Sequence, residues 1–181
     1  MKLFLFILLS LPFDFLVWDI INENFIDPIE EITNPTGEWA LRFLLLTLAI
    51  SPLNKITKIS LIKYRRMFGL MSFFYAVLHL GIFLIDKEFS LTLVFADIFK
   101  RPYITIGFSA FILMFLLTIT SNSFSIKKLK NKWKKLHNLI YLISLLVIVH
   151  FYWQVKSWQD IEPLIYTSIT LFLLGIRYVK R

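Results

Sequence analysis

Six apolar segments of helical length dominate this sequence and restrict the folds that it can adopt. A helix that spans a bilayer needs about 17 to 25 mainly apolar residues, and several of these segments lie at the short end of that range. Hydrophobic residues make up 57% of the chain, which is more than a soluble domain normally carries. We therefore predict an all-α integral membrane protein, a six-helix transmembrane bundle that forms a single domain over residues 1–181. The predicted spans are residues 3–21, 38–53, 68–85, 103–120, 137–155 and 163–178.

The first apolar segment also resembles a secretory signal peptide, because Lys2 precedes it. Asp14 and bulky residues follow, and no small-residue cleavage site appears. We interpret residues 3–21 as a retained helix, with a cleaved signal as the alternative. Pro12 predicts a kink within this helix.

Prolines also predict other helix boundaries. Ser51-Pro52 predicts the end of the second helix, because proline removes a backbone donor and disfavours a helical residue before it. Pro102 and Pro163 suit the first turns of the fourth and sixth helices, where the missing N–H has no cost.

The connecting segments alternate in charge along the chain. Residues 22–37 carry four acids and no Lys or Arg, whereas residues 54–66 carry five cations and residues 121–136 carry six lysines. Residues 86–101 are mixed, and the C-terminal tail is basic. Positively charged loops stay in the cytoplasm, so a topology of six helices with both termini cytoplasmic agrees with the charge of every connecting segment. The cations concerned are Lys55, Lys58, Lys63, Arg65 and Arg66 in the first basic loop and Arg177, Lys180 and Arg181 in the tail.

The composition excludes several classes of protein. No cysteine occurs, so disulfides, iron–sulfur clusters and cysteine nucleophiles are excluded. The chain has five glycines and no phosphate-binding glycine motif, which argues against a nucleotide-binding domain. The net charge of +8 lies in particular loops, so we assign it to topology and to anionic lipid and expect no nucleic-acid partner.

The chain's three histidines all lie in apolar segments, where an ionisable residue is costly and usually functional. His79 lies seven residues before Asp86 and His150 lies six residues before Lys156. Both helices run outward, so the two imidazoles should reach nearly the same depth on different helices. That arrangement suits the axial ligands of a haem b iron. The alternative is a pair of histidines that simply bond across helices.

The third histidine, His137, lies thirteen residues before His150, or about 20 Å along an ideal helix. That separation suits a second redox centre. However, the position that would supply its partner is Arg66, and His137 and His150 would point about 140° apart on an ideal helix. We therefore keep two interpretations of His137: a haem ligand or cofactor contact, and an interfacial histidine beside the lysine cluster.

Two arginines are further candidates for cofactor binding. Arg42, near the outer end of the second helix, could hold a haem propionate or a quinone oxygen, or it could extend to the membrane surface. Arg101, beside Tyr103, could contact haem, quinone or a partner, or anchor the interface. Glycines at 69, 81 and 107 allow close packing, either against a flat macrocycle or between helices. Aromatic residues at 133, 152, 153 and 158 form an interfacial belt.

Basic residues also allow two interpretations. The lysines of residues 127–135 and the pair Arg65-Arg66 are most simply cytoplasmic anchors. They could instead dock an anionic electron donor, such as a flavin or an acidic reductase. The acidic segment 22–37 and the mixed segment 86–101 form the expected docking surface on the outer side.

Four motifs carry a resemblance to a known family over about residues 36–156. They are TGEWALRFLLLTLAISPL (36–53), RRMFGLMSFFYAVLHL (65–80), KRPYITIGFSAFILMFLLTITS (100–121) and WKKLHNLIYLISLLVIVHFYWQVK (133–156). Together they resemble the MsrQ (YedZ) family, within the ferric-reductase-like transmembrane cytochromes.

The resemblance implies a haem b subunit of the bacterial inner membrane. Such a subunit passes electrons from the quinone pool, or from a cytosolic flavin reductase, to a periplasmic molybdenum-containing methionine sulfoxide reductase, MsrP. FMN is associated with the family. The family's haem-linked histidines fall on His79, His137 and His150. Larger relatives carry a fourth histidine and a flavin–nucleotide domain, and this chain has neither.

We therefore predict an electron-carrying subunit with no catalytic residues of its own. His79 and His150 are its predicted iron ligands, with His137 as a further candidate. Two alternatives belong to other classes: a haem-free transporter or scaffold, in which the histidines bond or relay protons, and a metalloreductase, for example of ferric iron, with a borrowed donor.

Overall fold

The computed structural model describes residues 2–22, 25–57, 60–155 and 160–179. Lys58, Lys156, Trp158, Lys180 and Arg181 lie outside the described residues. The described chain is helical, without strands. Its elements are α1 (Lys2–Ile21), α2 (Pro28–Thr57), the 3-10 helix η1 (Ile62–Tyr64), α3 (Arg65–Asp86), α4 (Leu91–Lys100), α5 (Pro102–Ile119), α6 (Ser123–Leu129), α7 (Asn131–His137), α8 (Ile140–Gln154) and α9 (Glu162–Val179).

Five helical stretches of the described chain are long and apolar enough to cross a membrane. They correspond to α1, α2, η1 with α3, α5, and α7 with α8. The sixth predicted span forms α9, which is not among these five, so the six-span count is not confirmed. The predicted starts near Pro102 and Pro163 are confirmed, because both prolines lie in the first turn of their helices.

Helix α2 is longer than the sequence suggested. It begins at Pro28, inside the segment that we expected to be an acidic loop, and it continues through Pro52 to Thr57. The predicted helix end at Ser51-Pro52 is therefore wrong. Pro52 cannot donate to the carbonyl of Leu48, four residues earlier, and Arg177 of α9 donates to that carbonyl instead. A side chain from another helix thus satisfies the acceptor that the proline leaves open.

The predicted helix over residues 137–155 is broken near its start. Helix α7 ends at His137 and α8 begins at Ile140, with turn residues Asn138 and Leu139 between them. His137 and His150 therefore do not lie on one regular α-helix, and the ideal angular separation between them does not apply.

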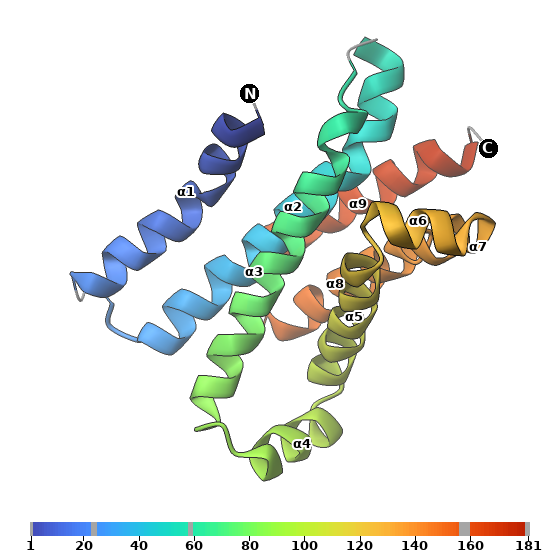
Figure 1. The fold of residues 1–181 in the computed structure, drawn as a ribbon. Helices are drawn as coiled ribbons and strands as arrows, with labels where there is room; N and C mark the ends of the chain where they lie inside the picture. Colours follow the sequence, from blue (N-terminus) through green and yellow to red (C-terminus); the bar gives the residue numbers. More distant parts are fainter. Residues whose placement is uncertain (1, 23–24, 58–59, 156–159, 180–181) are drawn as a thin grey trace.

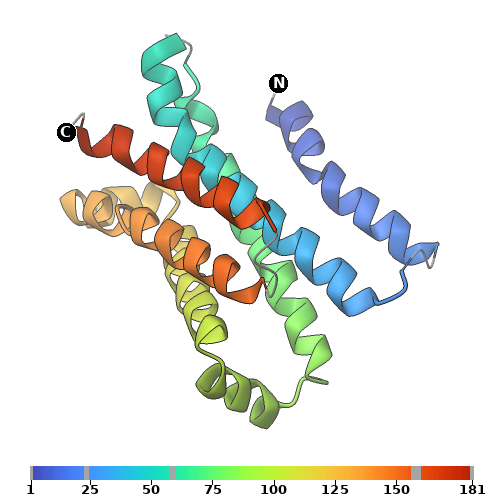
Figure 2. The same cartoon turned by 180° about the vertical axis from the view of Figure 1, so that it is seen from behind.

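Helix α2 lies at the centre of the bundle (Figures 1 and 2). Its side chains take part in two apolar clusters. One cluster joins its Leu41, Leu44 and Leu48 to α5, α8 and α9. The other joins its Phe43 to α1 and α3. Large apolar side chains elsewhere on the helices are exposed, as expected where lipid covers the surface.

Helix α1 is hydrogen-bonded to Tyr75 of α3. The Tyr75 hydroxyl donates to the carbonyl of Leu9 and accepts from the N–H of Phe13, on either side of Pro12. It thereby supplies partners to the backbone of α1 around the proline. The rest of α1 presents exposed Phe15 and Trp18.

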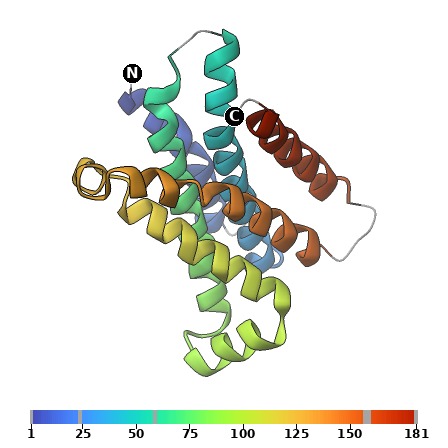
Figure 3. The same cartoon turned by 90° about the vertical axis from the view of Figure 1, so that its right-hand side faces the viewer.

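The bundle has two distinct ends, which we name by their elements. The α4 end carries α4 and the turns on either side of it, and it is the lower end in Figure 1. The basic end carries the end of α2, η1 and the start of α3 together with α6 and α7, and both chain termini lie toward it (Figures 1 and 3).

Candidate functional site

Two of the three histidines meet in the α4-end half of the bundle. The imidazole centroids of His79, on α3, and His150, on α8, lie 6.2 Å apart with their planes at 85°. Both side chains are half-buried. The sequence-based prediction that these rings share one level on two helices is confirmed by this contact, while their role as ligands stays a prediction.

A backbone carbonyl from another helix orients each of these rings, and the two carbonyls belong to α2 and α5. His79 Nδ1 lies 3.0 Å from the carbonyl oxygen of Thr33, on α2, and His150 Nδ1 lies 2.7 Å from that of Tyr103, on α5. A carbonyl can only accept, so each Nδ1 carries the proton. Nε2 of each neutral ring therefore holds the free lone pair, which is the arrangement that metal-binding histidines use.

A glycine lies behind each ring, four residues after the carbonyl that orients it. A Cβ atom at Gly37 would come within 3.0 Å of the His79 ring, and one at Gly107 would come within 2.7 Å of the His150 ring. At Gly107 a Cβ atom would force the ring or the helix to move, and at Gly37 the contact would be tighter than most real Cβ contacts. Glycine therefore lets the imidazoles lie this close to α2 and α5. The same device, a carbonyl and a glycine one helical turn apart, thus seats both histidines.

The spacing of the pair is compatible with two imidazoles that would hold a haem iron. Metal–imidazole bonds are about 2 Å long, so two imidazoles that held one iron between them would have ring centres roughly 6 Å apart. The observed centroid distance of 6.2 Å agrees with that requirement. Among the described residues, no group of three or more His, Asp or Glu could hold a bare metal ion. A macrocycle that brings four nitrogen ligands needs only two from the protein.

His137 lies apart from this pair, at the basic end. Its ring stacks on Trp133 with a centroid distance of 4.0 Å, and its Nε2 lies 3.1 Å from Oγ1 of Thr120. The Thr120 hydroxyl donates to the carbonyl of Leu116, so its oxygen is free to accept from Nε2–H. Nε2 of His137 is therefore used within the protein, unlike Nε2 of the other two rings.

A cavity of about 860 Å³ opens beside His137 between α2, α3, α5, α7, α8 and α9. Leu44, Met114 and Ile143 form part of its apolar wall, and Trp133 and Tyr141 contribute aromatic rings. Its size is in the range of small-molecule sites.

Arg42 is held by protein groups. Its Nε donates to the Tyr166 hydroxyl at 2.7 Å, its guanidinium pairs with Glu38, and it lies 4.7 Å from the centre of the Trp39 ring. These contacts tie α2 to α9. Cofactor contact by Arg42 stays a prediction.

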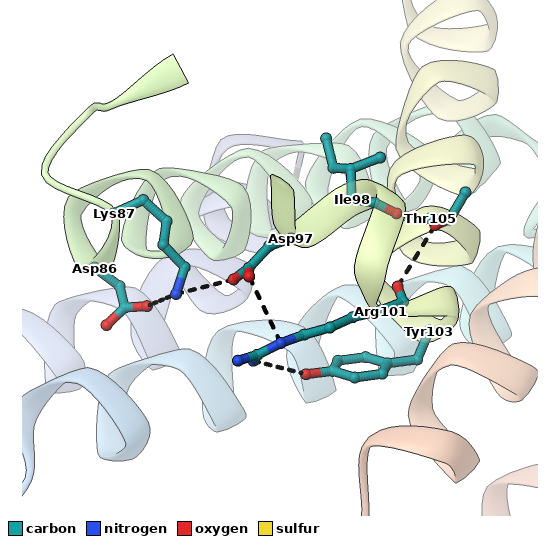
Figure 4. Close-up of polar contacts among 7 residues, drawn as sticks. All are labelled: Asp86, Lys87, Asp97, Ile98, Arg101, Tyr103 and Thr105. Atoms are coloured by element: carbon teal, nitrogen blue, oxygen red, sulfur yellow. Dashed lines mark hydrogen bonds and ion pairs between the residues drawn. The ribbon is translucent and has the colours of Figure 1, made fainter. Parts of the chain in front are cut away.

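Arg101 belongs to a charged network that braces the α4 end (Figure 4). Lys87 at the end of α3 pairs with Asp86 at 2.9 Å and with Asp97 of α4 at 3.0 Å. Arg101 approaches Asp97 at 3.6 Å and donates to the Tyr103 hydroxyl at 3.3 Å. Since the Tyr103 carbonyl orients His150, this network holds the start of α5 on which that histidine depends. Contact between Arg101 and a cofactor stays a prediction.

Sequence reasoning missed the groups that seat the histidines. Thr33 and Tyr103 act through backbone carbonyls, which no side-chain motif reveals, and Gly37 was not singled out. Of the glycines that were, position 107 packs against a histidine, position 69 makes an ordinary contact, and position 81 faces open space. The available signal was a glycine four residues after each residue whose carbonyl accepts from a histidine, in TNPTG (33–37) and YITIG (103–107).

Comparisons with known proteins give a family match and several named relatives. Residues 36–162 match the family described as ferric reductase like transmembrane component. A protein of Xanthomonas euvesicatoria pv. vesicatoria (strain 85-10), named protein-methionine-sulfoxide reductase heme-binding subunit MsrQ, is 50% identical over 158 residues, which are 86% of this chain and 72% of that protein. A protein of the same name from Herminiimonas arsenicoxydans is 44% identical over 181 residues, covering 97% of this chain and 83% of the relative. No solved structure matches.

Proposed function

This chain belongs to the MsrQ family of ferric reductase like transmembrane components, and we propose on that premise that it is a haem b electron-transfer subunit of the bacterial inner membrane. The observation that carries this proposal is the pair His79 and His150, 6.2 Å apart, each with Nδ1 bonded to a carbonyl. When bound, haem b supplies one-electron transfer at a potential set by its axial ligands.

The chain's own residues fix the ligands of this site before any cofactor binds. The carbonyls of Thr33 and Tyr103 keep Nδ1 protonated and Nε2 available, and such outer partners also raise the basicity of a ligating histidine. Gly37 and Gly107 let the rings lie against α2 and α5. The rings therefore need little reorganisation to bind iron.

The two ends of the bundle suggest the direction of electron flow. We place the basic end in the cytoplasm, as the positive-inside rule requires, and the α4 end in the periplasm. Electrons would enter from quinol or from a cytosolic reduced flavin and leave at the α4 end to a periplasmic molybdoenzyme of the MsrP type. The relatives' names, which refer to protein-methionine-sulfoxide reductase, support this acceptor. FMN is a second proposed cofactor from the family resemblance alone.

A difference spectrum tests the haem assignment. The purified wild-type protein should give a reduced-minus-oxidised spectrum of a low-spin haem b, and His79→Ala and His150→Ala should each abolish it, because either change removes one axial ligand. Lys132→Gln, a charge change at the basic end, serves as the control and should retain the full spectrum. Absence of haem b from the wild type contradicts the proposed function, and a low-spin signal in both histidine variants contradicts the pairing.

A further inference from the structure

The cavity beside His137 carries an unbalanced set of charges. Among the described residues that line it are five cations and no Asp or Glu, and the cations are Lys55, Arg65, Arg66, Lys134 and Arg177. The ion pairs found in the described chain involve Arg42, Lys87 and Arg101, away from this cavity. Cations gathered in this way without acids attract an anion.

Arg177 is turned into the bundle. One of its terminal nitrogens donates to the carbonyl of Leu48 and the other donates to the Tyr141 hydroxyl at 2.9 Å. Its guanidinium also lies 5.4 Å from the centre of the Tyr141 ring. A cation that served only as a membrane anchor would extend toward water or headgroups instead.

The contacts of Arg177 leave part of its guanidinium unused. Its Nε is buried and has no hydrogen-bond partner among the described residues, although a buried charged donor without a partner is costly. The charge of Arg177 also acts on Arg65, which lines the same cavity and is half-buried. Arg65 and Arg177 thus line one cavity, and Arg177 has an open donor there that an anion would satisfy.

We propose that this cavity binds the phosphate group of an anionic ligand, held by Arg65 and Arg177. Guanidinium donors suit phosphate oxygens through paired charge-assisted hydrogen bonds. Exposed Arg66, Lys55 and Lys134 guide the anion to the mouth. The apolar wall and the aromatic rings of Trp133 and Tyr141 accommodate the rest of the ligand.

The phosphate can come from two sources, a phosphorylated cofactor from the aqueous side or the headgroup of an anionic lipid. Basic pockets between helices on the cytoplasmic side commonly accept such headgroups. The two sources share the chemistry that Arg65 and Arg177 recognise, and different probes separate them.

The first arm uses two flavins that differ only in phosphate. The full-length protein, in a neutral detergent and a phosphate-free buffer, is titrated with FMN and with riboflavin, and flavin fluorescence reports binding. If the cavity takes a soluble phosphorylated ligand, FMN binds at least about tenfold more tightly than riboflavin, and Arg65→Gln removes the preference, because one charge-assisted contact is lost.

The second arm uses lipids. The protein is placed in nanodiscs of phosphatidylcholine with or without phosphatidylglycerol, and thermal unfolding and lipid retained after detergent extraction are measured. If the cavity takes a headgroup, phosphatidylglycerol raises the melting temperature and is retained by the wild type, and Arg65→Gln loses both effects.

Matched variants keep the result interpretable. Lys132→Gln removes the same charge at the same end, but Lys132 does not line the cavity, so it should behave as the wild type in both arms. Arg177→Lys retains the charge but lacks the Nε donor, and it should weaken phosphate binding even if Arg65→Gln does not fold. The haem spectrum should be unchanged in all three variants, which separates this site from the histidine pair.

The inference is overturned if the wild type shows no preference for phosphate in either arm, or if Arg65→Gln and Arg177→Lys bind both probes as Lys132→Gln does. A wild type without haem b that still prefers FMN or phosphatidylglycerol would contradict the proposed function and leave the phosphate site standing.

Discussion

The α4 end and the basic end of the bundle each place histidine near aromatic side chains, but they prepare it for different chemistry. His79 and His150 have Nδ1 bonded to carbonyls and Nε2 free. His137 has its Nε2 bonded to Thr120 and its ring stacked on Trp133. The first end offers two lone pairs to one metal, whereas the second surrounds an open cavity with cations.

For a histidine inside a membrane protein, the hydrogen-bond partners of its two ring nitrogens decide whether a nitrogen lone pair stays free to bind a metal. All three histidines fall in predicted apolar segments of the sequence, so composition alone does not separate them. A carbonyl behind Nδ1 prepares a ligand, while a hydroxyl at Nε2 occupies the nitrogen that a ligand would use.

The largest effect should come from adding one carbon behind His150. Gly107→Ala places a Cβ atom 2.7 Å from the ring, so the imidazole or α5 must move, and most of the bound haem should be lost. Gly37→Ala, with its contact at 3.0 Å, should lose less. Haem per protein, from the pyridine haemochrome assay, measures both. Gly81→Ala is the control because its Cβ meets nothing within 4 Å; equal haem in all three variants would contradict the seating by glycine.

Removing His137 should sharpen the contrast between the ends. His137→Ala should retain the low-spin haem signal of the His79–His150 pair. The lost stacking and hydrogen bond should lower the free energy of unfolding by about 1–2 kcal/mol. Loss of about half of the haem would instead show that His137 holds a second haem, so spectra and thermal unfolding are recorded on the same sample.

Disrupting the charged network tests whether its ion pairs stabilise the α4 end. Asp97→Asn removes the charge shared by Lys87 and Arg101, and we expect a loss of about 1 kcal/mol in stability with most haem retained. Asp86→Asn should cost less, since Lys87 keeps Asp97 as its partner. Thermal unfolding, followed by haem absorbance, compares the two variants. If Asp86→Asn were less stable than Asp97→Asn, Asp97 would not be the main stabilising carboxylate of this network.

The smallest effect concerns pH at the same network. Hydrogen bonds to Asp86 and Asp97 raise the pKa of the Lys87 ammonium from its ordinary 10.5. A raised pKa stabilises the fold below the ordinary value, and the contribution disappears as pH rises through the folded-state pKa. Lys87→Met should therefore lower the melting temperature by about 2 °C at neutral pH. The difference in melting temperature between the wild type and Lys87→Met should vanish at pH values above the folded-state pKa of Lys87. A difference that increased with pH would show that the charge of Lys87 is not its cause.

Much of the bundle could be predicted from the sequence because apolar length and proline position act locally. The starts of α5 and α9 follow from Pro102 and Pro163. The end of α2 did not follow from Pro52, because Arg177, more than a hundred residues later, satisfies the carbonyl that the proline leaves open. Helix α4 was also missed, because its ten residues lie in a segment of mixed charge.

The sequence by itself determined that His79 and His150 share a level on two helices, because residue counts to the membrane surface fix depth. Only the tertiary structure decided which nitrogen of each ring is free, because the carbonyls of Thr33 and Tyr103 come from other helices. It also decided that the cations of the basic end line a cavity, since Arg177 reaches it only through the packing of α9 against α2 and α8.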